Sequence, residues 1–245
     1  MNIIECTNTA NTTVSKNRKI KYIVIHYTAG ITSKPGTAKS NAKYFAKETT
    51  KASADFIIDD ENIVQYNPDI KNRYCWHCGG SKYKTKGGLL YKVCTSANSI
   101  GIEMCSTNST KKVTNPNDTN WYFTDSVIDN CVELTKKLME EYDIDPAHVI
   151  RHYDINGKPC PGVVGWNEDT GDISKWQDFI IRISPIPEPI VIEEAEEIVE
   201  VKVPEVVKEP EPIIKKEKSE IIQEKQEKSN FFKTILDIFL KLFNK

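Results

Sequence analysis

The sequence is poor in several features that would by themselves define its class. Its 245 residues include only 4 histidines, 3 methionines and 11 glycines, and the formal net charge is −2. A charge so close to zero gives no reason to expect a nucleic-acid partner. No stretch of about 18 apolar residues occurs, so no membrane-spanning helix is expected.

The start of the chain and its cysteines are also informative by what they lack. Residues 1–22 contain no apolar run of the kind found in a secretory signal peptide. We therefore expect synthesis in the cytoplasm, with retention there or exit by an unusual route. The seven cysteines are an odd number, which excludes a complete set of internal disulfides. Most of the thiols are expected to be reduced and buried.

Composition divides the chain into four parts. Residues 1–18 are polar and rich in Asn, Thr and Lys, which predicts a flexible leader. Residues 19–184 alternate apolar strands with amphipathic helices, which is typical of an α/β or α+β layered domain. Residues 185–228 hold 13 Glu and 7 Lys without Gly or aromatic residues, which predicts an extended linker. A long charged helix over 214–228 is the alternative.

The last part, residues 229–245, predicts a short amphipathic helix. In "FFKTILDIFLKLFNK" (231–245) the lysines and other polar residues share one third of a helical wheel, and apolar residues fill the rest. At about 1.5 Å per residue the helix is too short to span a bilayer. A wide apolar face opposite lysines suits contact with a membrane or envelope surface. Docking on the domain or self-association is the alternative.

Within residues 19–184, hydrophobic periodicity predicts six elements. The long helix is expected to begin after Thr124, a good N-cap residue. The six elements are a buried strand over 22–25 that ends at His26, a helix over 37–51, a hairpin over 54–66 with its turn at 59–62, a strand over 99–105, and helices over 124–144 and 173–183.

Two histidines and a cysteine form a candidate metal site. His26 lies where a buried strand gives way to a loop, and His152 and Cys160 flank a turn rich in Gly and Pro, "RHYDINGKPCPG". Two imidazoles and a thiolate, with a fourth position open to water, are the ligand pattern of catalytic zinc. The simpler interpretation of a lone histidine at a strand end is a structural role.

Two charged residues extend this candidate site. In "SIGIEMC" the Glu103 side chain shares an otherwise apolar strand face with Gly101, which leaves room for another group to approach. A carboxylate there needs a partner or a role, and beside a metal it would suit a general base. A salt bridge on an edge strand is the alternative. Lys158, two residues before Cys160, would suit an oxyanion-stabilising cation or be an ordinary surface lysine.

Several segments resemble one known family. "IVIHYTAG", "SADFIID…IVQY", "CWHCGG", "NSIGIEMC" and "DPAHVIRHYDINGKPCPG" occur in family order and look like zinc-dependent N-acetylmuramoyl-L-alanine amidases of the type 2 amidase, or peptidoglycan-recognition-protein-like, superfamily. The resemblance is strongest to phage and prophage endolysins and covers about residues 19–183. It implies a central mixed β-sheet flanked by helices, with one zinc ion in a surface groove.

The resemblance also implies roles for individual residues. His26, His152 and Cys160 match the zinc ligands, while Glu103 and Lys158 match the catalytic pair. A further implied feature is substrate contact, expected for Trp76 and His77 in the "WH.G" motif. The position of a tyrosine that is catalytic in some members is Ala54 here, which shifts the base role toward Glu103. The implied partner is bacterial peptidoglycan, and the implied place of action is the cell wall.

Other motifs leave alternatives open. "CWHC" (75–78) suits a redox dithiol or half a zinc site less well than a disulfide or simple packing. Asp154 is expected either to hold the His152 segment by hydrogen bonds or merely to form a turn. His148 is expected to cap a turn or face solvent. Aromatic residues that would line a groove or pack in the core are Trp76, Trp121, Tyr122 and Trp166. A non-catalytic peptidoglycan-binding module remains the alternative function.

Overall fold

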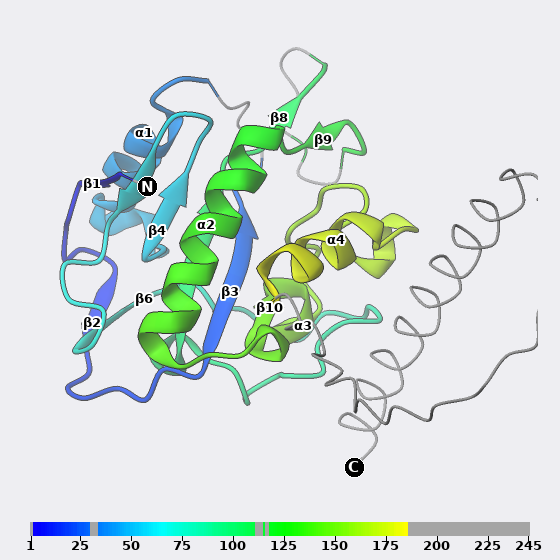
Figure 1. Cartoon of the computed structure of the whole chain (residues 1–245). Helices are drawn as coiled ribbons and strands as arrows, with labels where there is room; N and C mark the ends of the chain where they lie inside the picture. Colours follow the sequence, from blue (N-terminus) through cyan, green and yellow to red (C-terminus); the bar gives the residue numbers. More distant parts are fainter. Residues whose placement is uncertain (1, 30–33, 111–114, 116–117, 186–245) are drawn as a thin grey trace, which may run out of the picture. The chain divides into compact units, whose positions relative to one another are not determined.

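The computed structural model of the chain describes residues 2–29, 34–110, 115 and 118–185 (Figure 1). The predicted linker beyond residue 185 and the predicted helix over 229–245 lie outside the described residues. None of the helices in the described part of the chain is long and apolar enough to cross a membrane.

The centre of the domain is a mixed sheet, as the resemblance implies, and this sheet has six strands. Its strand order is β1-β5-β4-β7-β3-β10. Strands β4, β7, β3 and β10 run parallel to one another, whereas β5 is antiparallel to β4 and β1 is parallel to β5. The strands are β1 (Ile3–Glu5), β3 (Tyr22–Tyr27), β4 (Phe56–Ile58), β5 (Ile63–Gln65), β7 (Ser99–Met104) and β10 (Val149–Arg151).

Four α-helices and two small sheets complete the described part of the chain. The helices are α1 (Thr37–Phe45), α2 (Asp125–Tyr142), α3 (His152–Asn156) and α4 (Ser174–Ile183). One small sheet pairs β2 (Thr12–Val14) with β6 (Arg73–Cys75), and the other pairs β8 (Thr107–Asn108) with β9 (Trp121–Tyr122). Short 3₁₀ turns occupy Glu48–Thr50, Ser96–Asn98, Pro146–His148 and Glu168–Thr170.

The two faces of the sheet are covered differently. Helices α2 and α4 pack on one face, where alternate strand residues such as Ile25 and Ile102 build the main hydrophobic core (Figure 1). On the other face α1 covers β4 and β5 in a second cluster that contains Ile57. A third, smaller cluster lies beside β3 and β10 and includes Val24. Strand β3 is therefore buried on both faces, as its apolar run predicts.

The predicted elements of the domain agree with the structure within a few residues. The hairpin forms around Asp59, whose side-chain Oδ1 accepts hydrogen bonds from the backbone of Glu61 and Asn62. Helix α2 begins as expected, because the Thr124 side chain accepts a hydrogen bond from Val127 N. Helix α1 is shorter than predicted and ends at Phe45.

The prediction of a flexible leader over residues 1–18 is wrong. Strand β1 pairs with β5 in the main sheet, and β2 pairs with β6. Arg18 is partly buried and holds the end of this segment in place. Its guanidinium donates to the carbonyl oxygens of Ile70 at 3.2 Å and Arg73 at 2.5 Å. It also donates to the carbonyls of Ala97, Ser96 and Ser99. Residues 3–18 are therefore part of the folded domain.

We expect Arg18→Met to lower the free energy of unfolding by about 3 kcal/mol, because several carbonyl acceptors lose a charged donor that the apolar side chain cannot replace. Urea unfolding followed by circular dichroism measures the loss. Lys19→Met is the matched control, since Lys19 is exposed and should tolerate the change. Equal stability of the two variants would show that residues 1–18 contribute little to the fold.

Candidate metal centre

The candidate site forms where three parallel strands end at one edge of the sheet. His26 on β3 and Glu103 on β7 are direct partners in the strand register. On the other side of β3, Ile25 is paired with Arg151, the last residue of β10. His152 follows Arg151 and therefore lies at the level of His26. Side chains of directly paired residues point to the same face of a sheet. The register alone therefore brings two predicted site residues side by side and a third next to them.

A tight return of the chain adds the cysteine. Helix α3 begins at His152 and ends at Asn156, and it is capped by Gly157, whose φ of 79° is the left-handed conformation that favours glycine at a helix end. The chain then doubles back, and Tyr153 N donates to the carbonyl of Cys160 at 2.9 Å. The Cys160–Pro161 peptide bond is cis. Within this return Lys158 N donates to Asn156 Oδ1 at 3.0 Å.

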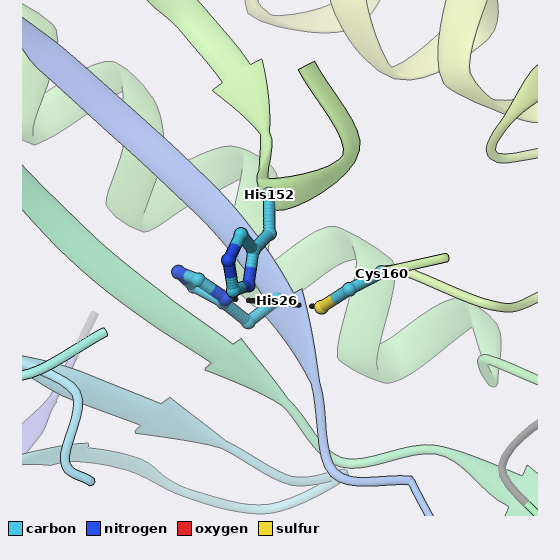
Figure 2. Close-up of side chains that lie close together, drawn as sticks. All are labelled: His26, His152 and Cys160. Atoms are coloured by element: carbon cyan, nitrogen blue, oxygen red, sulfur yellow. Dashed lines mark hydrogen bonds between the residues drawn. The ribbon is translucent and has the colours of Figure 1, made fainter. Parts of the chain in front are cut away.

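The three predicted ligands converge (Figure 2). One donor atom from each of His26, His152 and Cys160 lies within 4.8 Å of the other two, and all three residues are buried. His26 Nδ1 lies 3.7 Å from Cys160 Sγ. His152 Nε2 is buried and has no hydrogen-bond partner among the described residues, although a buried ring nitrogen normally has one. The ring also makes a hydrogen bond to the backbone of Gly79.

The electrostatic state of these residues suits a metal cation. Burial lowers the pKa of His152 to about 4 and that of His26 well below its ordinary value, so both imidazoles are neutral at pH 7. Burial raises the pKa of the Cys160 thiol to about 12, while a hydrogen bond from the Tyr27 backbone favours the thiolate. The three residues thus offer two neutral imidazoles and one thiol, and the Nε2 atom of His152 has no hydrogen-bond partner among the described residues. These groups fit a zinc ion whose fourth coordination position is left open.

His77 lies behind His26 and is almost enclosed. Its side chain is 2% exposed. His77 Nδ1 is 3.1 Å from His26 Nε2, the ring nitrogen of His26 not directed at Cys160. On its other side, His77 Nε2 is 3.3 Å from Ser99 Oγ and 3.9 Å from Asp55 Oδ2. This placement supports a role in orienting His26 and leaves little of the ring to touch a substrate.

Asp55 is a residue of the site region that the sequence reasoning missed. It is fully buried, and its carboxylate accepts hydrogen bonds from Gly101 N at 2.8 Å and Asn67 Nδ2 at 2.6 Å. Burial alone would lower the pKa of His77, but Cys78 and Asp55 raise it. The available signal was an aspartate at the start of an apolar strand, where a charge needs a buried partner.

Glu103 and Lys158 complete the set. Strand β7 lies between β4 and β3, so the alternative of a salt bridge on an edge strand is wrong for Glu103. Burial raises the pKa of Glu103 to about 7, although Lys158 and His77 act to lower it. Lys158 is exposed, while Glu103 keeps some solvent exposure. Glu103 and Lys158 therefore lie on the side of the buried His26, His152 and Cys160 that is nearest to solvent.

The His152 segment is held by Asp154, as one of the two interpretations predicts. Its carboxylate accepts from Arg151 N at 2.7 Å and from the Arg151 guanidinium at 2.6 and 3.0 Å. Arg151 also donates to the carbonyl of Trp166 at 2.9 Å. These bonds fix the residue immediately before His152. His148 is exposed and bonds Asp145.

The remaining candidates separate into core and surface. Trp121 and Trp166 are 1% and 0% exposed and belong to the main core, whereas Tyr122 is 38% exposed. Trp76 is partly buried and donates from its indole to Thr13 Oγ1 at 2.8 Å. All seven cysteines are free thiols, so the structure contains no disulfide in "CWHC".

Comparison with known proteins identifies the family of the chain. The profile of the N-acetylmuramoyl-L-alanine amidase family Amidase_2 matches residues 16–163. The chain belongs to this amidase family. Amidase CwlH of Bacillus subtilis is 29% identical over 168 residues, covering 69% of this chain and 54% of CwlH. Amidase BlyA of the same species is 27% identical and is covered to 42%. The chain thus spans about half the length of the curated relatives it matches.

Solved amidase structures share the fold. The catalytic domain of XlyA aligns with 75% of this chain and 100% of its own length, at 27% identity and a TM-score of 0.54. A mutant endolysin from Bacillus subtilis aligns with 75% of this chain and 99% of its own, at 28% identity and a TM-score of 0.52. The aligned part of this amidase-family chain therefore spans the whole of the XlyA catalytic domain.

The tight packing of His77 on Gly101 allows the positioning role of His77 to be tested. A Cβ at Gly101 would lie 2.7 Å from His77 Cγ, so Gly101→Ala must displace the ring and disturb its contact with His26. We expect zinc affinity to fall about tenfold or more, as measured by competition with a chromogenic chelator. Gly79→Ala is the matched control, because nothing lies within 4 Å of its Cβ. Unchanged affinity in Gly101→Ala would exclude a positioning role for His77.

Proposed function

We propose that the chain is a zinc-dependent N-acetylmuramoyl-L-alanine amidase of the endolysin type. It would cleave peptidoglycan at the amide between the lactyl group of N-acetylmuramic acid and L-alanine, and so lyse a bacterial host at the cell wall. The observation that carries this proposal is the buried His26–His152–Cys160 donor set with Glu103 beside it. Membership of the amidase family and the endolysin structure among its neighbours support the same activity.

Three residues would hold the metal. His26 would bind through Nδ1, which faces Cys160, and His152 through Nε2, which has no other partner. Cys160 would bind as the thiolate. A zinc ion held there supplies Lewis-acid chemistry, polarising the scissile carbonyl and making water more acidic. His26 Nε2 would then donate to His77 Nδ1, which fixes the orientation of the imidazole.

Glu103 would act as general base and then general acid. Its pKa of about 7 lets a fraction of the carboxyl groups be ionised and accept a proton from the attacking water at neutral pH. The same carboxyl then gives the proton to the leaving amino group of L-alanine. Lys158, exposed and linked electrostatically to Glu103, would stabilise the negative charge that develops on the carbonyl oxygen.

The predicted substrate contacts receive different weight. The enclosed position of His77 favours positioning of His26 over contact with the glycopeptide. Trp76 keeps part of its surface exposed, so its contact with substrate stays a prediction. Contact of residues 231–245 with a membrane or envelope, or self-association through them, also stays a prediction.

The activity is tested by digesting purified peptidoglycan with the full chain, with and without a chelator. We expect new L-alanine amino termini without new reducing sugar ends, and their loss when the chelator removes zinc. Mass analysis of the released peptides and glycans distinguishes the two kinds of product. Reducing ends would identify a glycosidase instead. Binding to peptidoglycan without any cleavage, by a protein that purifies free of zinc, would support the non-catalytic binding module.

Glu103→Gln should abolish activity while making the metal-free fold more stable. The folded-state pKa of about 7 exceeds the ordinary value of 4.5, so ionisation opposes folding as the pH rises through this range. The amide cannot ionise, and we expect the free energy of unfolding to rise by about 2 kcal/mol near pH 8 and hardly at all near pH 4.

Activity of the same variant should fall at least about a hundredfold, with zinc content unchanged. Urea unfolding at the two pH values and the peptidoglycan digest measure both effects. Glu133→Gln, on α2, is the control for a change of charge away from the site. A Glu103→Gln protein with full activity would remove Glu103 from the mechanism.

A further inference from the structure

Two cysteines outside the ligand set lie in contact beside the metal centre. Cys78 and Cys94 make a side-chain hydrogen bond to each other and belong to the same small hydrophobic cluster on β3 and β10. Cys94 is 2% exposed, whereas Cys78 keeps partial exposure to solvent. One residue of the pair therefore reaches the surface, whereas the other is enclosed.

The chain between the two cysteines packs against the helix that carries His152. Tyr83 N donates to the carbonyl of Asn156 at 2.7 Å, Gly88 N to that of Tyr153 at 3.0 Å and Leu90 N to that of Asp154 at 2.9 Å. Thr85 Oγ1 donates to the carbonyl of Gly157 at 2.8 Å. We term residues 78–94 the α3-supporting loop. Its middle residues donate hydrogen bonds to α3 and to Gly157, and the cysteines at its two ends are in contact with each other.

The surroundings of Cys78 favour a reactive thiol. Its Sγ lies 3.3 Å from His77 Nδ1 and 3.4 Å from Ser99 Oγ. Burial alone would raise the pKa of the Cys78 thiol, but the hydrogen bond from Cys94 is the largest of the contacts that lower it well below its ordinary value. The hydrogen bond to Cys78, together with burial, raises the pKa of Cys94. Cys78 is therefore the nucleophile of the pair and Cys94 the resolving thiol.

The "CWHC" motif does not provide the partner. Cys75 belongs to the cluster under α1 and is hydrogen-bonded to Ser53 and Asp55, whereas Cys78 packs in the cluster beside β3 and β10. The sequence neighbours thus lie in separate clusters, while the residue 16 positions further on is in contact.

We propose that Cys78 and Cys94 form a reversible disulfide that closes the α3-supporting loop beside the metal centre. With a low-molecular-weight disulfide such as oxidised glutathione as oxidant, the Cys78 thiolate attacks one of its sulfurs and releases one glutathione thiolate. Cys94 loses its proton and attacks Cys78 in this mixed disulfide, which releases the second glutathione. Two protein thiols are oxidised, and one glutathione disulfide is reduced to two thiols.

The test is to equilibrate the zinc-loaded full chain with reduced and oxidised glutathione at several ratios, alkylate the free thiols and map the peptides by mass spectrometry. We expect a Cys78–Cys94 link at oxidising ratios that disappears at reducing ratios. Cys94→Ala should instead retain glutathione on Cys78. Cys6→Ser is the control, since Cys6 is also partly exposed and its loss should leave the link intact.

A second readout follows the loop itself. Lys82, Lys84 and Lys86 are exposed, so trypsin can cut the α3-supporting loop. We expect cleavage there to be at least several-fold slower in the oxidised protein, and the fragments to stay joined until reduction. Cys78 and Cys94 both alkylated at every ratio, or Cys78 linked to Cys75, would overturn the proposal. Equal cleavage rates in the oxidised and reduced forms would exclude the closure of the loop.

Discussion

The parallel pairing of β7, β3 and β10 is the constraint on which the rest of the site depends. Hydrogen bonds along the backbone set His26 opposite Glu103 and Ile25 opposite Arg151. A shift of one residue in either pairing would send these side chains to opposite faces of the sheet. The apolar residues of β3 and β7 prevent such a shift, because alternate positions belong to the core under α2 and α4. The core that stabilises the domain thus also fixes the distance between His26 and Glu103.

The sheet face that carries the site combines its two apolar clusters with a series of buried polar contacts. Asp55 bonds to Gly101 and lies near His77, which in turn contacts His26. Each member is buried, so each would be unfavourable without its neighbour. Gly101 is needed at this point because any larger side chain would occupy the space of the His77 ring. A chain of contacts from the buried Asp55 carboxylate to His26 therefore sets the orientation of the His26 ring.

The parts of the fold that could be predicted from the sequence are those with a local signal. The apolar run of β3, the alternation in β7 and the periodicity of α2 each lie in an element of six residues or more. Strands β1, β2, β6 and β10 have three residues each, and their partners are distant in the chain. No local sequence pattern predicts such pairings, because their stability comes from hydrogen bonds between segments that are distant in the chain.

The site shows the same limit at the level of single residues. The resemblance to amidases identified His26, His152 and Cys160, which the structure brings together, and it also pointed to His77. It did not provide the surroundings of His77, which depend on the packing of Ser99, Gly101 and Asp55 against one ring. Helix α3 has only five residues, too few for periodicity to distinguish it from the turn that the glycines and prolines indicate. Residue identity is read from motifs, whereas orientation requires the three-dimensional neighbours.

The proposed zinc site would also couple folding to metal binding. Without a cation it consists of two neutral imidazoles and a buried thiol, and one imidazole nitrogen has no hydrogen-bond partner among the described residues. Such groups lose hydration on folding and gain little in return. A zinc ion bound as proposed would supply the missing partner and favour the thiolate, so part of its binding free energy would stabilise the fold. Because His152 and Cys160 lie on one short return of the chain and His26 lies on β3, this stabilisation would join α3 to the central sheet.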